Sequence, residues 1–182
     1  MRTLILAAAL LALAAPAHAQ IVVTGDGSAQ GCFTSAMTGN TGTPAAIREC
    51  SDALGEVLTT SDRAATLVNR GVLYMRRGDQ DRAVADYERA LELQPELPEA
   101  HINASAAFYY LGRDDRALEA IDTALALGTD KEAEALFNRA LIHDRQENYR
   151  AAYRDLTRVL TLRPDWQAAQ DARARYTVKR RS

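Results

Sequence analysis

The stretch DRAVADYERALEL, at residues 81–93, carries the pattern that decides the fold. Related stretches follow it, with DRALEAIDTALAL at residues 115–127 and YRAAYRDLTRVLTL at residues 149–162. Equivalent positions are separated by 34 and then 35 residues, as shown by the alanines Ala83, Ala117 and Ala152. A fixed period of this length is typical of a protein built from stacked repeats, each of which packs on its neighbours.

Each repeat is predicted to contain two α-helices. In the first repeat, residues 64–77 form one helix, and the turn residues Gly78 and Asp79 follow it. In the second helix, apolar side chains recur with the spacing of an amphipathic helix, at Ala83, Tyr87, Ala90 and Leu91. Small residues that allow close helix packing recur in the first helices, at Gly71, Ser105 and Ala140. The sequence therefore predicts an all-α protein.

The repeats resemble the tetratricopeptide repeat family. The first unit fills the family pattern with Leu67, Gly71, Tyr74, Ala83, Tyr87, Ala90 and Pro95. The later units depart from that pattern at His101, Thr129 and His143. The resemblance implies a right-handed α-solenoid of helix-turn-helix repeats with a C-terminal capping helix.

The repeat register also divides the chain into units. Residues 46–54 align with residues 83–91, which indicates a degenerate helical hairpin before the first full repeat. The expected units are a signal peptide at 1–19, a disordered leader at 20–31, the degenerate hairpin at 32–63, repeats at 64–97, 98–132 and 133–166, and a capping helix with a basic tail at 167–182.

The first residues have the features of a secretory signal peptide. Arg2 supplies a positive charge, residues 4–15 form an apolar run, and small residues follow, so cleavage is expected after Ala19. The run is shorter than the roughly 20 residues that cross a bilayer, which makes a retained anchor the weaker alternative. We therefore expect export to the bacterial periplasm, with no stable membrane insertion after cleavage.

The two cysteines of the chain are Cys32 and Cys50. Exported proteins reach an oxidising compartment, where paired cysteines usually form a disulfide, and this is the favoured interpretation. The spacing is not C-x-x-C, so a redox or metal-binding role is the weaker alternative. In the repeat register, the disulfide would join the two helices of the degenerate hairpin.

No catalytic motif is present in the sequence. His101 and His143 fall at positions where the other repeats place packing residues, which favours a packing role over a catalytic or metal-ligating one. The formal net charge is −2, with acidic and basic residues interspersed, which argues against a nucleic-acid partner. We therefore expect no enzyme activity, no cofactor and no bound metal.

In the family's fold, one side of the first helices lines a concave groove that binds peptides, and the resemblance implies such a groove here. Asparagine recurs at the same place in each repeat, and its amide matches the donor and acceptor of a peptide unit. The alternative is that this asparagine is only a consensus feature of the family. The candidate groove residues are Val68, Asn69, Val72, Arg76, Ile102, Asn103, Tyr109, Tyr110, Phe137, Asn138, Leu141 and Arg145.

The predicted function is a non-catalytic scaffold or adaptor of the bacterial periplasm that binds a peptide or helix of a protein partner in this groove. One alternative is a self-assembling structural protein, because the ends of a solenoid expose apolar edges. A weaker alternative is a metal-binding or enzymatic accessory protein, for which the support is the proximity in sequence of His143, Asp144 and Glu147.

Overall fold

A computed structural model of the chain describes residues 27–38 and 42–176. Within these two segments, the regular structure consists of nine α-helices and no strand. The helices are α1 (Ser28–Met37), α2 (Pro44–Gly55), α3 (Thr60–Arg77), α4 (Gln80–Leu93), α5 (Pro98–Tyr110), α6 (Asp114–Leu127), α7 (Glu132–Arg145), α8 (Tyr149–Leu162) and α9 (Gln167–Ala174).

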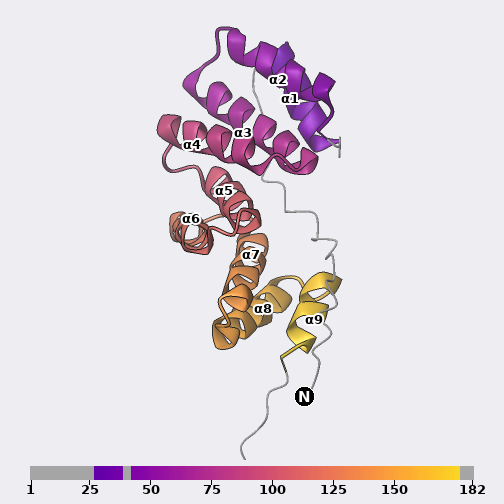
Figure 1. Ribbon diagram of the computed structural model, residues 1–182, viewed down its shortest axis with the longest axis vertical. Helices are drawn as coiled ribbons and strands as arrows, with labels where there is room; N and C mark the ends of the chain where they lie inside the picture. Colours follow the sequence, from indigo (N-terminus) through magenta and orange to yellow (C-terminus); the bar gives the residue numbers. More distant parts are fainter. Residues whose placement is uncertain (1–26, 39–41, 177–182) are drawn as a thin grey trace, which may run out of the picture.

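The helices stack in pairs along the long axis of the molecule (Figure 1). Helix α3 packs on α4, α5 on α6, and α7 on α8, while α1 and α2 form the pair at one end and α9 lies against α8 at the other. This arrangement confirms the predicted all-α repeat solenoid with a C-terminal helix. None of the helices in the described ranges is long and apolar enough to cross a membrane.

The turns between paired helices follow the predicted chemistry. Gly78 ends α3 in the left-handed region, with φ of 80°, and the Asp79 side chain then accepts a hydrogen bond from the backbone N–H of Arg82 at the start of α4. Gly112 has the equivalent role after α5, with φ of 71°. In the third repeat this position is Glu147, which adopts φ of 59° although it carries a side chain.

Close packing within a repeat depends on the small residue of its first helix. A Cβ built on Gly71 would lie within 2.9 Å of three ring atoms of Tyr87, which is a fully buried side chain of α4. The other repeats place a larger residue in the first helix and a smaller one in the second, as the pairs Ser105 with Ile121 and Ala140 with Leu156. The side chain in the second helix of the pair is therefore smaller where the side chain in the first helix is larger.

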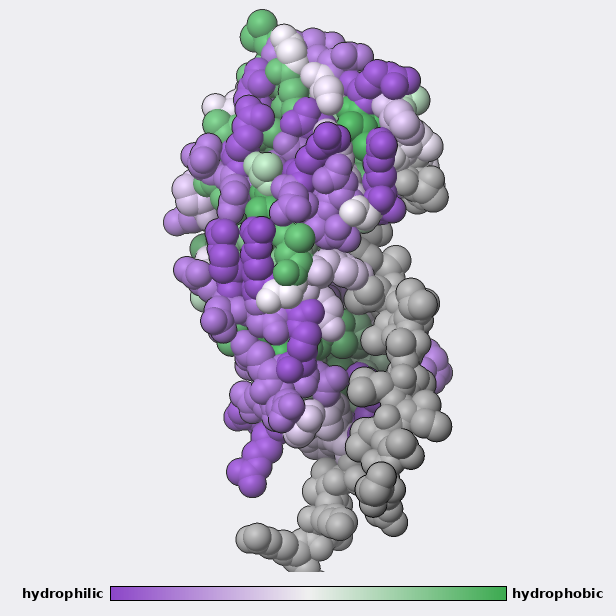
Figure 2. Space-filling model, in the orientation of Figure 1, coloured by the Kyte–Doolittle hydropathy of each residue, from purple (hydrophilic) through white to green (hydrophobic). Residues whose placement is uncertain are grey.

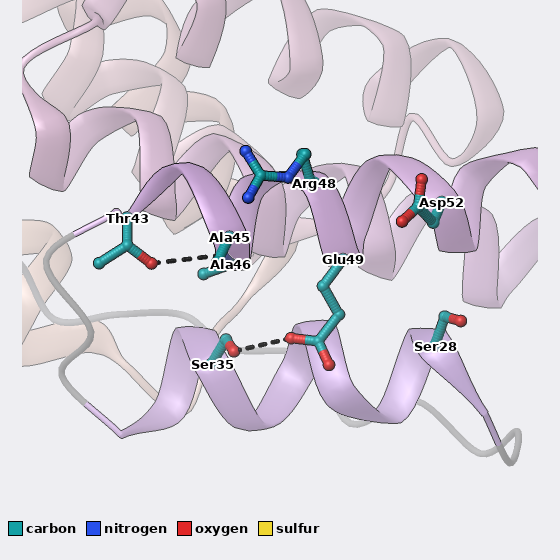
Figure 3. A pocket seen from close by; sticks show the side chains of 8 residues that line it. All are labelled: Ser28, Ser35, Thr43, Ala45, Ala46, Arg48, Glu49 and Asp52. Carbon is teal, nitrogen blue, oxygen red and sulfur yellow. Dashed lines mark hydrogen bonds between the residues drawn. The ribbon is translucent and has the colours of Figure 1, made fainter.

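The predicted disulfide is present between Cys32 of α1 and Cys50 of α2, with the two Cα atoms 4.7 Å apart. Figure 3 shows the two helices side by side, with the Ser35 hydroxyl donating to the Glu49 carboxylate at 3.0 Å. In the same view, the Thr43 hydroxyl accepts from the N–H of Ala46 and thereby caps the start of α2.

The expected boundary of the leader at residue 31 is wrong, because α1 begins at Ser28. Ala29, Cys32 and Ala36 form a buried stripe along α1, and this apolar contact extends the helix into a segment whose composition resembles a loop. Likewise, α3 begins at Thr60, four residues before the expected start of the repeat. The Thr59 hydroxyl caps this helix by accepting a hydrogen bond from the backbone N–H of Asp62. The predicted signal peptide, the remainder of the leader and the basic end at 177–182 lie outside the described residues.

Candidate peptide-binding face

The first helices of the three full repeats lie in one row, in which α3 contacts α5 and α5 contacts α7 (Figure 1). All of the candidate groove residues belong to these helices. We call the side of α3, α5 and α7 that carries them the first-helix face. The repeat period thus places residues that are about 34 positions apart in sequence next to one another in space.

The predicted residues of this face lie at two depths. The buried set consists of Val68, Asn69, Val72, Ile102, Asn103, Phe137 and Leu141. The set that retains solvent access consists of Arg76, Tyr109, Tyr110, Asn138 and Arg145. A ligand that docks on the described structure therefore meets the second set directly, whereas the first set supports it from below. Sequence reasoning identified both sets but not this difference in depth.

The asparagines of the three repeats keep their common register in the structure, at Asn69, Asn103 and Asn138. Asn69 and Asn103 are buried, and Asn138 is partly buried. The Nδ2 group of Asn138 is shielded from solvent and has no hydrogen-bond partner among residues 27–38 and 42–176. An amide donor without an acceptor is unfavourable, so rotation of the partly buried Asn138 side chain toward a docked carbonyl group would be stabilised.

Aromatic and charged groups meet where α5 and α7 end. The Arg145 guanidinium lies over the Tyr109 ring, with Cζ 3.8 Å from the ring centroid, and its Nε donates to Asp114 at 2.8 Å. Burial lowers the pKa of Arg145 below its ordinary value, and Tyr109 opposes that shift. Burial raises the pKa of Tyr110, and Tyr109 adds to the increase. Tyr110 is therefore neutral at neutral pH, and its side chain is exposed to a ligand.

The C-terminal end of this face is closed by α9 and the residues around it. The rings of Phe137 and Trp166 stack with centroids 4.8 Å apart. The Tyr176 hydroxyl donates to the Asp144 carboxylate. Burial raises the pKa of Tyr176 above its ordinary value, and the hydrogen bond to Asp144 adds to the increase. Sequence analysis considered Asp144 only beside His143 and Glu147 and did not predict its bond to Tyr176, because that contact needs the chain to fold back from α9.

The sequence neighbours His143, Asp144 and Glu147 do not form a candidate metal site. Asp144 accepts from Tyr176, while Glu147 sits in the left-handed turn after α7. Across residues 27–38 and 42–176, no group of three or more His, Cys, Asp or Glu side chains is arranged to hold a metal ion. His143 is partly buried, and burial lowers its pKa. His101 is also partly buried, with Nε2 2.9 Å from the carbonyl oxygen of Pro95.

The visible side of the molecule in Figure 2 is mostly hydrophilic, with only small separate hydrophobic areas. The exposed large apolar side chains of the described residues are scattered from α1 to α8 instead of forming one broad patch. Recognition on a surface of this kind depends on a few aromatic, amide and charged side chains more than on apolar area.

Comparison with known proteins identifies the repeat. Two family profiles, both described as tetratricopeptide repeat, match residues 64–97 and 105–169, which together make up more than half of the chain. A photosystem I assembly protein, Ycf3, from Rippkaea orientalis is 31% identical over 80 residues, a match that covers 44% of this chain and 41% of that protein. The chain thus spans less than half of the length of this curated relative.

Solved structures share the fold at low sequence identity. The Cut9–Hcn1 hetero-tetramer of APC/C matches with a TM-score of 0.71 and 19% identity, over 82% of this chain and 29% of that one. The first tetratricopeptide domain of RPAP3, solved with an HSP90 peptide, matches with a TM-score of 0.60 and 24% identity, over 63% of this chain and 90% of that one.

Proposed function

Because the chain belongs to the tetratricopeptide repeat family, we propose that it is a non-catalytic scaffold that binds a peptide or helix of a protein partner on the first-helix face. The observation that carries the proposal is the asparagine register on α3, α5 and α7, in which the Asn138 Nδ2 group lacks an acceptor within the described part of the chain. A backbone carbonyl of a bound peptide supplies that acceptor. The RPAP3 domain, which was solved with a bound peptide, supports the proposal by its similar fold.

The neighbours of Asn138 extend the proposed contact. Tyr110 and Tyr109 offer rings for apolar side chains of the ligand, and aromatic residues of this kind often dominate protein–protein contacts. Arg145 is already paired with Asp114 and stacked on Tyr109, so it holds the wall of the site instead of serving as a free cation. The site therefore favours a ligand recognised through its backbone and apolar side chains over one recognised through a terminal carboxylate.

The second part of the proposal is that the scaffold works in the bacterial periplasm after removal of residues 1–19. Its support is the signal-like sequence alone, with Arg2, the apolar run and the small residues before Gln20. Cell fractionation followed by N-terminal sequencing tests it. We expect the exported form to begin at Gln20, and a form that retains Met1 in the cytoplasm contradicts this part of the proposal.

Affinity capture from a periplasmic extract tests the binding function. We expect the wild-type protein to retain a partner on the affinity column. Asn138→Ala and Tyr110→Ala should each lower the affinity for that partner at least about tenfold, because each change removes about 1.4 kcal/mol or more of binding free energy. Tyr149→Ala is the matched control, since Tyr149 is an exposed tyrosine on α8, with 51% of its surface accessible. Substitutions at Ile102 are unsuitable, because that side chain is 1% exposed and its loss disturbs folding.

Circular dichroism of each variant separates lost binding from lost structure. The proposal fails if the variants of the first-helix face, folded like the wild type, capture the same partners with unchanged affinity. It also fails if Tyr149→Ala reduces capture as much as Tyr110→Ala does.

A further inference from the structure

Buried guanidinium–carboxylate pairs join the two helices of the first and third repeats. Arg70 of α3 donates to both carboxylate oxygens of Asp86 in α4, at 2.7 Å each. Arg139 of α7 makes the same two bonds to Asp155 in α8, at 2.8 and 2.9 Å. The Asp86 and Asp155 side chains are 5% and 11% exposed. Because each arginine makes two bonds to one carboxylate, each pair fixes the paired helices relative to each other.

Each of these arginines also reaches the second helix of the preceding unit. The Nη1 group of Arg70 donates to the Ser51 hydroxyl in α2 at 3.0 Å. The Nη1 group of Arg139 donates to the Asp122 carboxylate in α6 at 2.8 Å. In the first and third repeats, one guanidinium therefore connects three helices. The third partner also occupies the same register position in both cases.

The middle repeat lacks the pair. The residues in register with the arginine and the aspartate are Ala104 in α5 and Ala120 in α6, while the position of the third partner holds Glu88 in α4. These three residues line one pocket of about 170 Å³ between α4, α5 and α6. Ala104 and Ala120 stand where the neighbouring repeats have arginine and aspartate, so the pocket occupies the space that the ion pair fills in those repeats. We call it the middle-repeat pocket.

The middle-repeat pocket combines an apolar floor with an acidic rim. Ala104 and Ala120 are 2% and 8% exposed and form the floor. Glu88 on the rim pairs with Arg116 at 2.9 Å. Glu119 also lies on the rim, is exposed, and its carboxylate makes no hydrogen bond or ion pair within the described residues. The pocket thus has two carboxylates and one guanidinium, so its charge favours a cationic group.

The aromatic wall of the pocket points to the same kind of group. In the first repeat, the Tyr74 ring has two guanidiniums near it, those of Arg70 and Arg82, at 5.9 and 5.7 Å from the ring centroid. Phe108 is the equivalent residue in the middle repeat, and within the described chain it has one guanidinium, that of Arg116 at 4.2 Å. The alanine at position 104 therefore leaves part of the Phe108 surroundings open for a second planar cation.

We propose that the middle-repeat pocket receives an arginine side chain of a protein partner. The aliphatic stem of that arginine packs on Ala104 and Ala120, and its guanidinium lies beside Phe108 with the carboxylates of Glu88 and Glu119 as acceptors. The volume is adequate, because a cavity of about 150 Å³ holds a benzene-sized group. Arginine fits better than lysine because its planar fork stacks on rings and binds carboxylates with two bonds. This contact lies on α4, α5 and α6 and does not depend on binding to the first-helix face.

Titration with small probes, followed by NMR of the isotope-labelled protein, tests the proposal. The probes are Nα-acetyl-arginine amide, Nα-acetyl-lysine amide and Nα-acetyl-leucine amide. We expect the arginine probe to cause saturable shifts of the Glu88, Ala104 and Ala120 amide signals. Its affinity should exceed that of the leucine probe by about tenfold, as expected for hydrogen bonds to a charged group. Equal or tighter binding of the lysine or leucine probe overturns the assignment to arginine.

Variants of the pocket test whether the arginine probe binds there. Ala104→Arg combined with Ala120→Asp installs the ion pair of the neighbouring repeats, so we expect it to abolish binding of the arginine probe. Glu119→Gln should weaken binding several-fold, whereas Glu92→Gln, a change at an exposed carboxylate of α4 outside the pocket, should not. If the double variant does not fold, Ala104→Leu fills the same space. Persistent binding to a folded variant with a filled pocket overturns the proposal, as does the absence of binding to the wild type.

Discussion

The contact between Gly71 and Tyr87 shows how a single atom limits the packing of a repeat. Gly71→Ala adds a Cβ that would lie within 2.9 Å of three ring atoms of Tyr87. We expect the free energy of unfolding to fall by about 1–3 kcal/mol, which is typical of an overpacked core. Urea unfolding followed by circular dichroism measures the change.

A second substitution tests the cause of that loss. The third repeat combines Ala140 with Leu156, so Tyr87→Leu in the Gly71→Ala background recreates a pair that the chain already uses. The double variant should lose less stability than the sum of the two single changes. Strict additivity of the two effects contradicts the proposed steric conflict.

Glu147 adopts a backbone conformation that favours glycine. Its φ of 59° lies in the left-handed region, which costs an ordinary residue about 1–2 kcal/mol. Glu147→Gly removes that cost but increases the freedom of the unfolded chain, so we expect a net gain of about 0.5–1 kcal/mol in the free energy of unfolding. Thermal unfolding of this variant, with Gly78→Ala as a control that should lose stability, measures the effect. A less stable Glu147→Gly variant contradicts the expectation.

At the scale of single elements, the N-terminal hairpin depends on a covalent link. Cys32 and Cys50 join α1 to α2, and a small buried cluster around them includes Ile47 and Leu73. A loop of about 17 residues closed by a disulfide is worth roughly 3 kcal/mol. After replacement of both cysteines by alanine, we expect the amide protons of α2 to exchange faster by about two orders of magnitude, because 1.4 kcal/mol corresponds to tenfold.

The remainder of the chain provides the internal control for this experiment. Helices α5 to α8 make no extensive contact with α1 or α2, so their amide protons should keep their protection. Uniform loss of protection along the chain would show that the hairpin is not an independent unit, and unchanged protection of α2 would show that the disulfide contributes little.

Much of the fold could be predicted from the sequence because the period repeats the same packing problem. The spacing of Ala83, Ala117 and Ala152 determined the helix pairs, and the register of residues 46–54 indicated the additional hairpin. The start of α1 could not be predicted in this way. Residues 28–31 are small or polar, and they become helical because Ala29 is buried against neighbouring helices.

The candidate site was only partly predictable for a similar reason. The register identified Asn138 and its equivalents, but it could not show that Ile102 is buried while Tyr110 is exposed, since depth depends on how successive repeats rotate. The middle-repeat pocket did leave a signal in the sequence. Ala104 and Ala120 interrupt two columns that otherwise hold arginine and aspartate.

At the scale of the whole molecule, α9 determines whether the solenoid ends or continues. Its buried residues Ala169 and Ala172 cover a cluster that includes Leu156, and the ring of Trp166 stacks on Phe137. Solenoid ends without such a cover expose apolar surface to other copies. If this cover is effective, we expect the protein to be monomeric, in contrast to the alternative of a self-assembling structural protein.

Trp166→Ala tests this balance between capping and assembly. Loss of the partly buried Trp166 ring and its stack on Phe137 should cost about 1–3 kcal/mol, loosen α9 and expose Phe137 and its neighbours. In analytical ultracentrifugation we expect the wild type to remain monomeric at micromolar concentrations, whereas the variant associates as its concentration rises. Leu127→Ala, a change at an exposed leucine of α6, is the control and should behave as the wild type does. If the wild type forms concentration-dependent oligomers through this end, α9 does not cap the solenoid and end-to-end assembly becomes the better account of the molecule.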